Sequence, residues 1–315
     1  MANLVLKPRK WQNKGLLFKA EATYGLDATP TGAANWIEAR NVQLVPMDTE
    51  KAERNIDMPY MGSSGSIVTG QWAKLSFDAA VAPSGSAGVA PKIGPLLRAC
   101  GWSETVTVGT SVVYNLVSNN FDSATAYMNI DGVLHALIGV RGDTKCKMAA
   151  KGLGMFSFSF DGIFVTPVAG LMPTVSRTGW TVEEGINSKN TGAVTINGVD
   201  LAFSTFDWSQ GNKIARINLP GPQLEVSIDG RAPQASVTVL APALGTFDPF
   251  ALVSAQQVVT FENTHGSSLG KKLQTSMRVR IANAEYDKIE EMVAYKLTLE
   301  PVPVDGNDEL TLTFL

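Results

Sequence analysis

The sequence predicts a mainly β protein with two tandem antiparallel β-sandwich or barrel domains, each carrying one short flanking α-helix. Three observations predict this class. Short alternating polar and apolar segments are separated by turn residues, helical spacing is confined to short stretches, and one order of segments occurs twice. In residues 41–101 and again in 199–256, a strand and a basic loop lead to a long strand, an Ala-Pro stop and a short apolar helix. A length of 315 residues accommodates two such domains.

The first half predicts an N-terminal arm and one domain. We expect an arm over residues 1–40, in which residues 16–22 start a strand and residues 24–32 carry turn chemistry, followed by a domain over residues 41–170. Alternation predicts strands at 41–46 and 67–82. The polar, mixed-charge stretch Glu50–Ser66 between them predicts a long protruding hairpin or loop.

The rest of this domain predicts one helix packed on sheet. A helix over 91–101 places Leu96, Leu97 and Cys100 on one buried face, with Gly101 as its C-terminal cap. Asp131-Gly132 predicts a two-residue hairpin turn. Further strands are predicted at 105–108, 112–116, 124–130, 133–140, 145–150 and 156–165.

The second half predicts a linker over 171–190 and a second domain over 191–315. Hairpin turns are expected at Asn197-Gly198 and Asp229-Gly230, and one extra helical turn at 285–293. The apolar stretch 249–255 is the second short helix. Strands are predicted near 193–206, 213–219, 223–229, 234–241, 258–262, 272–283, 294–300 and 310–315.

Composition argues against tight nucleic-acid binding and against a membrane protein. The net charge is −3, with no global basic field, and two cysteines make no disulfide framework. No apolar stretch reaches the length of a membrane span, and the apolar run after Met1 is too short for a signal peptide. We therefore expect no membrane insertion and a protein made and kept in a cytoplasm.

Groupings with catalytic chemistry are missing from the sequence. His135 and His265 each stand alone, which favours a structural role for His135 in a strand and an exposed turn position for His265. The segment Gly266–Lys272 is one residue short of a phosphate loop and has no Ser or Thr for magnesium. We expect no enzyme, no catalytic residue, no cofactor and no metal site.

Several segments, taken in order, carry a family resemblance. They are Glu21–Asp27, Val42–Pro46, Pro59–Gly62, Gly94–Gly101, Ser111–Tyr114 and Asn129–His135. This order resembles that of the major tail proteins, or tail tube proteins, of long-tailed, siphovirus-like bacteriophages, over residues 15–170. The resemblance implies tail-tube-like β-sandwich domains whose sheets join between subunits into a barrel around a DNA channel.

The resemblance also implies a function and partners. A structural virion protein would polymerise as stacked rings into the phage tail tube, the conduit for DNA ejection, after assembly in the host bacterial cytoplasm. Its partners would be copies of itself, the tape measure protein, the tail terminator and tail-tip proteins, with transient non-specific contact with double-stranded DNA. A ring would hold three two-domain chains, or six chains if the second half is a decoration domain.

Two sets of candidate residues follow. The resemblance implies a loop that bridges adjacent rings, here Glu50–Ser66 with a counterpart at Trp208–Gln223, and the candidates are Glu50, Glu53, Arg54, Asp57, Tyr60 and Arg216. Alternation places Lys74, Ser76 and Asp78 on one strand face, which makes them candidates for the lumen.

Two other classes stay open at this point. A β-sandwich binding module of the tail, for carbohydrate or a receptor, would need an exposed aromatic-lined pocket, and the sequence displays no aromatic cluster of that kind. A β-rich glycoside hydrolase would need a pair of carboxylates facing each other across a substrate, whereas the adjacent acids at Glu183-Glu184 and Glu290-Glu291 favour solvated surface.

Overall fold

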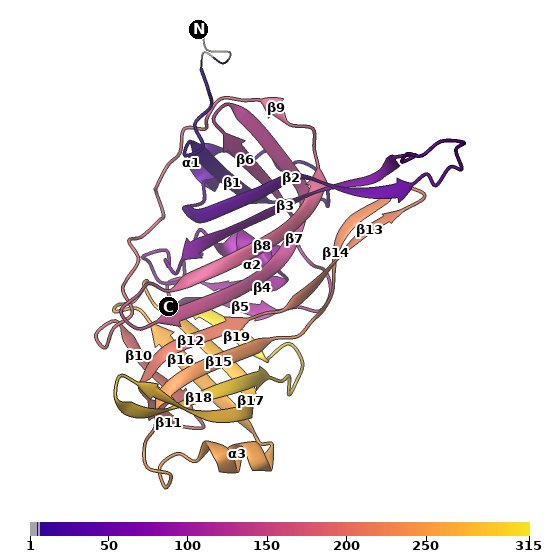
Figure 1. The fold of residues 1–315 in the computed structure, drawn as a ribbon. Helices are drawn as coiled ribbons and strands as arrows, with labels where there is room; N and C mark the ends of the chain where they lie inside the picture. Colours follow the sequence, from indigo (N-terminus) through magenta and orange to yellow (C-terminus); the bar gives the residue numbers. More distant parts are fainter. Residues whose placement is uncertain (1–4, 6) are drawn as a thin grey trace.

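The computed structural model, which describes residues 5 and 7–315, confirms a mainly β antiparallel protein (Figure 1). Strands make up 54% of the chain and helices 5%. Hydrogen bonding joins 17 strands into one sheet and leaves two strands as a separate hairpin. Because one sheet runs through both halves, strand pairing by itself draws no boundary between tandem domains.

The first half is a curved antiparallel sheet with strand order β2-β3-β8-β7-β6-β1. The helix α2 packs against it, and the hairpin β4–β5 follows that helix. The elements are β1 (Lys14–Ala20), α1 (Gly32–Asn35), β2 (Ala39–Glu53), β3 (Ser66–Ala80), α2 (Gly94–Ala99), β4 (Trp102–Thr107), β5 (Ser111–Leu116), β6 (Ala124–Ile130), β7 (Val133–Ala149), β8 (Met155–Phe164) and β9 (Val168–Ala169).

The second half forms a sheet with order β12-β15-β18-β17-β16-β10. The hairpin β13–β14 leaves this sheet between β12 and β15 (Figure 1). The elements are β10 (Thr191–Ile196), β11 (Val199–Leu201), β12 (Phe203–Ser209), β13 (Asn212–Leu219), β14 (Gln223–Arg231), β15 (Gln234–Leu240), α3 (Pro249–Ala255), β16 (Val258–His265), β17 (Leu273–Ile289), β18 (Met292–Pro301) and β19 (Leu310–Phe314).

Two ladders join the halves. Residues 145–149 of β7 pair with residues 205–209 of β12, and residues 112–115 of β5 pair with 311–314 of β19. Aromatic rings follow the joint: Trp208 packs against Phe156 at 6.1 Å and against Trp102 at 6.0 Å between ring centroids. The indole of Trp102 donates to Gln210, whose amide donates to the carbonyl of Cys100. The apolar core is therefore continuous across the joint.

Local sequence explains most of these elements. Phe156, Phe158 and Phe160 alternate with polar residues along β8, and all three rings are buried. Asp131 and Gly132 adopt positive φ angles of 42° and 92°, as a two-residue hairpin turn requires, and the pair Asn197-Gly198 does the same. These predicted turns are confirmed.

The predicted helix is confirmed in shortened form, as α2. Leu96, Leu97 and Cys100 are fully buried, and Pro95 occupies the first turn, where its missing N–H costs no helical hydrogen bond. Gly101 follows with φ 84°, a conformation in which a side chain would be strained.

The strand expected from residue 16 is confirmed as β1, but the expectation that this segment belongs to an arm is wrong. Leu16, Leu17 and Phe18 are buried in β1, which pairs with β6 along its whole length. The short apolar run showed no partner in the sequence, because β6 lies more than 100 residues further along the chain. The prediction for residues 1–4 and 6 lies outside the described residues, and Lys7, Arg9 and Lys10 are exposed.

Further predictions in the second half are also wrong. Asp229-Gly230 lies inside β14 beside a register shift, so it makes a bulge rather than a turn. Residues 285–293 are the tip of the β17–β18 hairpin, with Glu290 at φ 56°, and not a helical turn. His265 is buried at the end of β16, where its Nδ1 lies 2.8 Å from the hydroxyl of Thr191, although we expected it to be exposed.

The burial of α2 yields a test of the packing. Replacing Leu97 with Ala removes a fully buried side chain and should lower the free energy of unfolding by about 2–5 kcal/mol. The control Val106→Ala alters an exposed strand position and should change it by about 0.5 kcal/mol or less. Denaturant unfolding followed by circular dichroism measures both, and equal effects would show that α2 is not packed on the sheet.

Candidate functional site

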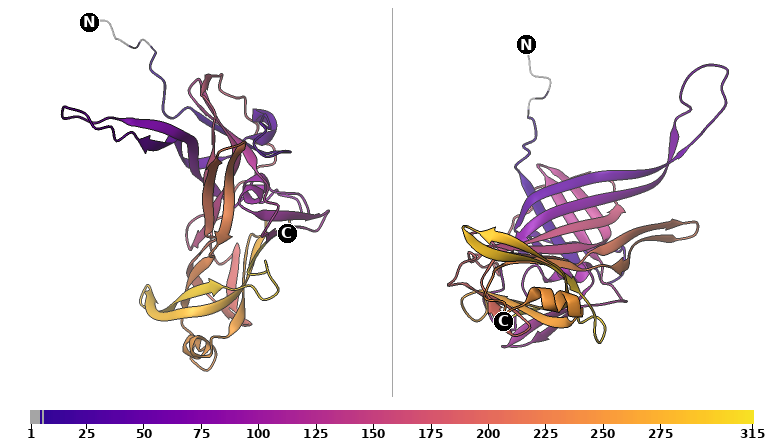
Figure 2. Two further views of the ribbon diagram at one scale, coloured as in Figure 1. Left: turned by 90° about the vertical axis from the view of Figure 1, so that its right-hand side faces the viewer. Right: turned by 60° about the horizontal axis from the view of Figure 1, so that its bottom comes forward.

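Two hairpins leave the same side of the body (Figures 1 and 2). The first is the outer part of β2 and β3 with its loop at residues 54–65, and the second is β13–β14. The amide of Asn218 in β13 donates to the carbonyl of Thr69 in β3 at 3.1 Å, so the two touch. We call them together the double hairpin.

Arg216 fastens the two hairpins to the sheet. From β13 its Nε donates to Asp161 of β8 and its Nη1 to Asp48 of β2, each at 2.9 Å. The guanidinium also lies over the ring of Trp72, 5.6 Å from the ring centroid. Hydrogen bonds from Lys74 and then Arg216 hold the pKa of the Asp48 carboxyl below its ordinary value. The loop predicted at Trp208–Gln223 is wrong, because most of this stretch forms the end of β12 and the strand β13.

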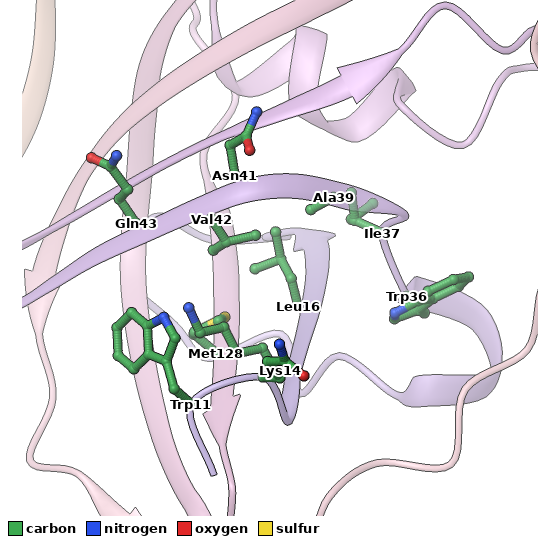
Figure 3. Close-up of a pocket in the computed structure, with 11 residues that line it drawn as sticks. Trp11, Lys14, Leu16, Trp36, Ile37, Ala39, Asn41, Val42, Gln43 and Met128 are labelled. Atoms are coloured by element: carbon green, nitrogen blue, oxygen red, sulfur yellow. The ribbon is translucent and has the colours of Figure 1, made fainter.

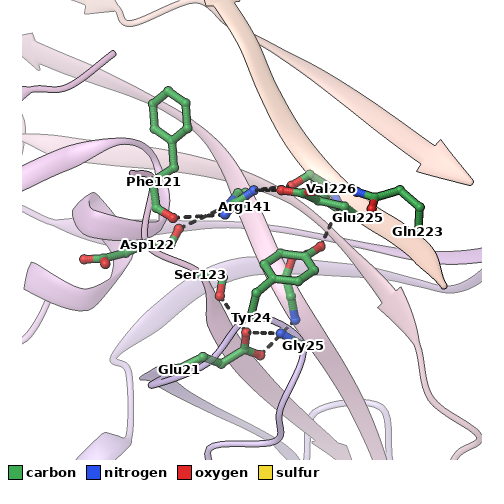
Figure 4. A network of polar contacts seen from close by, with 11 residues as sticks. Glu21, Tyr24, Gly25, Phe121, Asp122, Ser123, Arg141, Gln223, Glu225 and Val226 are labelled. Carbon is green, nitrogen blue, oxygen red and sulfur yellow. Dashed lines mark hydrogen bonds and ion pairs between the residues drawn. The ribbon is translucent and has the colours of Figure 1, made fainter. Parts of the chain in front are cut away.

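The root of β14 is anchored by a second polar network (Figure 4). Arg141 of β7 is largely buried and donates to the Glu225 carboxylate at 2.7 Å and to the carbonyl of Val226 at 2.9 Å. Tyr24 packs under the same guanidinium, and its hydroxyl accepts from the Val226 N–H. Glu21 in turn accepts from the N–H groups of Gly25 and Gly139. Residues 21–25 thus hold the base of the second hairpin.

The tip of the first hairpin is an exposed surface. Tyr60 and Met61 have exposed fractions of 69% and 103%, so two adjacent apolar side chains are largely in solvent at this tip. Glu53, Arg54 and Asp57 are exposed beside them, as predicted for this stretch. Glu50 differs, because its carboxylate accepts from the indole of Trp72 at 2.7 Å and so fixes the base of the arm. Further exposed apolar side chains on the double hairpin are Ile56, Ile67, Val68, Leu219 and Leu224.

The outer face of the sheet is polar on both sides of the joint, and we call it the polar face. Lys74, Ser76 and Asp78 of β3 lie on it, opposite the buried Ala73, Leu75 and Phe77. One row of paired residues crosses the joint as Asp78, Ser157, Lys145 and Ser209. A second row runs through Lys147, Asp207, Ser236 and Thr298. The strands that carry this face are β2, β3, β8, β7, β12, β15, β18 and β17.

A cavity of about 690 Å³ opens beside the outer edge of β2 (Figure 3). Leu16, Val42 and Met128 line its apolar wall, and Trp11 and Trp36 stand at its sides. Trp36 is packed edge-on against Trp180, whose indole donates to the Trp36 carbonyl. Lys14 lies 3.4 Å from the ring centroid of Trp11. This aromatic grouping could not be predicted from the sequence, because Trp11 and Trp36 come from either side of β1.

Reactive chemistry is sparse in the described part of the chain. Residues 5 and 7–315 contain no group of three His, Cys, Asp or Glu side chains placed to hold a metal ion. Burial raises the pKa of the Cys100 and Cys146 thiols. Among the described residues no helix is long and apolar enough to cross a membrane. The candidate sites described above are the double hairpin, the polar face and the cavity beside β2.

Comparison with known proteins adds no assignment: no family model and no curated protein matches the chain.

The clamp made by Arg216 yields a second test. Replacing Arg216 with Met removes the donors to Asp48 and Asp161 and should loosen the β13–β14 hairpin by about 1–3 kcal/mol. Amide hydrogen exchange of residues 212–231 should become faster by tenfold or more. Lys74→Met is the matched control, because it removes only a half-exposed ion pair to Asp48 and should leave that exchange unchanged. Equal exchange in both variants would contradict the clamp.

Proposed function

We propose that this protein is a structural virion protein, the tail tube subunit of a siphovirus-like phage, which polymerises as stacked rings into the conduit for DNA ejection. The observation that carries the proposal is a strand order that occurs twice in one continuous sheet. Such a chain presents two similar units side by side, as a ring of alternating units requires. The family resemblance of residues 15–170 supports the same assignment.

The repeated order supports two tail-tube-like domains over a tube domain with a decoration domain. The order β2-β3-β8-β7-β6-β1 of the first half matches β12-β15-β18-β17-β16-β10 of the second, and all pairs are antiparallel. The fourth strand has 17 residues in both (β7 and β17), and the third has 10 in both (β8 and β18). A projecting hairpin leaves each unit between its first two strands, and a short helix follows the second strand. Three such chains would supply six domains to one ring.

The polar face suits a channel for DNA. Its rows mix Lys145 and Lys147 with Asp78 and Asp207 and with serine hydroxyls, so no continuous cationic track would hold phosphates. Contact with double-stranded DNA would be transient and non-specific. Lys74, Ser76 and Asp78 would then face the lumen, and the tape measure protein is a further expected partner of the tube.

The double hairpin suits contact between rings. It projects from the body, carries exposed apolar side chains at Tyr60 and Met61, and is held at its base by Arg216 and Arg141. A rigid arm whose tip exposes apolar side chains loses little conformational entropy when it docks. Repeated head-to-tail docking makes a tube, which the tail-tip proteins and the tail terminator would close at its two ends.

One observation favours the alternative of a β-sandwich binding module for carbohydrate or a receptor. The cavity beside β2 has tryptophans at its sides, as sugar sites often do. A monomer that binds glycans, with binding lost in Trp11→Ala, would support that class.

Electron microscopy of the purified protein tests the function. Rings with three chains and six similar domains, stacked into tubes, are the expected result. Six chains per ring would keep the tube and make the second half a decoration domain. Monomers at every concentration, together with Trp11-dependent glycan binding, would replace the tube with the binding module.

The loop at residues 54–65 yields a further test. Replacing Asn55–Ser64 with an Asn-Gly turn removes the exposed tip while keeping Glu50 and its bond to Trp72. The variant should fold and form single rings, but tubes should be lost in micrographs. Rings serve as the internal control, and tubes of normal length would show that this loop does not bridge them.

A further inference from the structure

The ladder between β7 and β12 defines one contact between the two similar units. Residues 145–149 of β7 run past the end of β6 and pair antiparallel with β12, so that Cys146 lies opposite Trp208 and Lys147 opposite Asp207. Cys146 and Met148 are buried there, with exposed fractions of 2% and 0%. The fourth strand of the first unit thus covers the edge of the first strand of the second unit.

Within the described residues, the corresponding edge of each unit is open, on β17 in the second unit and on β2 in the first. In the described residues, positions 285–289 of β17 pair only with β18, although the corresponding part of β7 pairs on both sides. The outer edge of β2 over residues 40–45 has no ladder partner among those residues either, whereas β12 is covered by β7. Unpaired strand edges are templates for another strand.

The residues opposite each edge on the neighbouring strand show which positions of β17 correspond to β7 and which positions of β2 correspond to β12. Cys146 lies opposite Phe156 of β8, and Tyr286 lies opposite Tyr295 of β18 at the matching position. On the other edge, Trp208 lies opposite Ala235 of β15, and Leu44 lies opposite Leu75 of β3. Tyr286 therefore corresponds to Cys146, and Leu44 to Trp208.

We propose that β17 of one copy pairs antiparallel with β2 of a second copy in the register of the β7–β12 ladder. Tyr286 then lies opposite Leu44, Asp287 opposite Gln43 and Glu285 opposite Val45. This inference rests on the proposed ring and names its interface. The occupant of the β2 edge is a second copy of this chain, because the molecule already contains the same contact between its own halves.

Burial and charge fit this occupant. Tyr286 has an exposed fraction of 66% and packs against Phe250 and Tyr295, so its ring faces the apolar side of the sheet. Pairing brings that ring onto half-buried Val42 and Leu44, at the open side of the cavity beside β2. On the other face, Glu285 comes next to Val45, whose neighbour across β2–β3 is Lys74. Glu285 and Asp287 thus lie opposite Val45 and the neutral Gln43, so no like charges face each other across this ladder.

The length of the contact is also limited on both sides. Pro46 follows the open stretch of β2 and has no N–H to donate, and a register shift in the β2–β3 ladder lies at the same place. β17 ends at Ile289, where the hairpin turns into β18. A second register shift lies between Arg40 and Gln43, with Asn41 at φ 52°, so the regular paired segment would be shorter than the five pairs of the β7–β12 ladder.

Engineered cysteines test the pairing. Gln43 of β2 and Asp287 of β17 are both exposed, and these two strands lie in opposite halves of the molecule (Figure 1), so a disulfide between Gln43→Cys and Asp287→Cys joins two copies. Directly opposite residues in a ladder come within disulfide reach. Oxidation of the double variant should give a ladder of covalent oligomers on a non-reducing gel, and mixed single variants should give dimers only. The native thiols at Cys100 and Cys146 are buried and should stay unreacted.

The matched control is Gln43→Cys with Lys296→Cys. Lys296 is exposed on the same face but lies one strand inward, opposite Glu285, so it should cross-link at least tenfold more slowly. Circular dichroism checks that each variant is folded. Equal cross-linking of the two pairs would overturn the proposed register. Tubes in micrographs without the ladder would keep the function and overturn the pairing, whereas a ladder without tubes would keep the pairing and overturn the tube.

Discussion

The 17-residue strand β7 is the constraint on which most of the molecule depends. It pairs with β6 at its start, with β8 through its middle and with β12 at its end, so a single strand takes part in the sheets of both halves. Because β12 is held there, the chain leaves β12 into β13 at a defined place, and Arg216 reaches Asp161 and Asp48. Arg141, also on β7, fixes the return strand β14. The position of the double hairpin is therefore set by a backbone ladder and two arginine clamps.

The alternation of side chains gives this sheet one apolar, buried face and one polar, exposed face. One face buries Phe156, Phe158 and Phe160 with the tryptophans at the joint, and it supplies the apolar burial that stabilises the fold. The other face carries serines and charges of both signs, and it is free to meet solvent or a passing polymer. Within the described residues, the outer edges of β2 and of residues 285–289 in β17 have no ladder partner, and such edges are templates for another strand. This is why strand edges and projecting arms, and not a pocket of reactive groups, carry the proposed function.

Much of the fold could be predicted from the sequence, because period-two alternation and turn residues are local signals. The strands, the turns at Asp131-Gly132 and Asn197-Gly198 and the buried face of α2 follow from them. The burial of β1 could not be predicted, because it depends on pairing with distant β6. The role of Arg216 could not be predicted for the same reason. A basic residue in a polar stretch is typical of a loop, and its partners Asp48 and Asp161 are distant in the sequence. The ring-bridging and lumen roles of the predicted residues stay predictions.

The segment between the halves has a kinetic consequence. Residues 170–190 form no regular strand ladder, yet they lie against the first half through Trp180, Thr181 and Ile186. This tether holds the second unit near the first, so the β7–β12 contact forms at a high local concentration that dilution of the protein does not reduce. In a ring of three such chains, half of the contacts would be made before any two subunits meet. Only the contacts between chains would respond to protein concentration, and assembly would begin with three encounters in place of six.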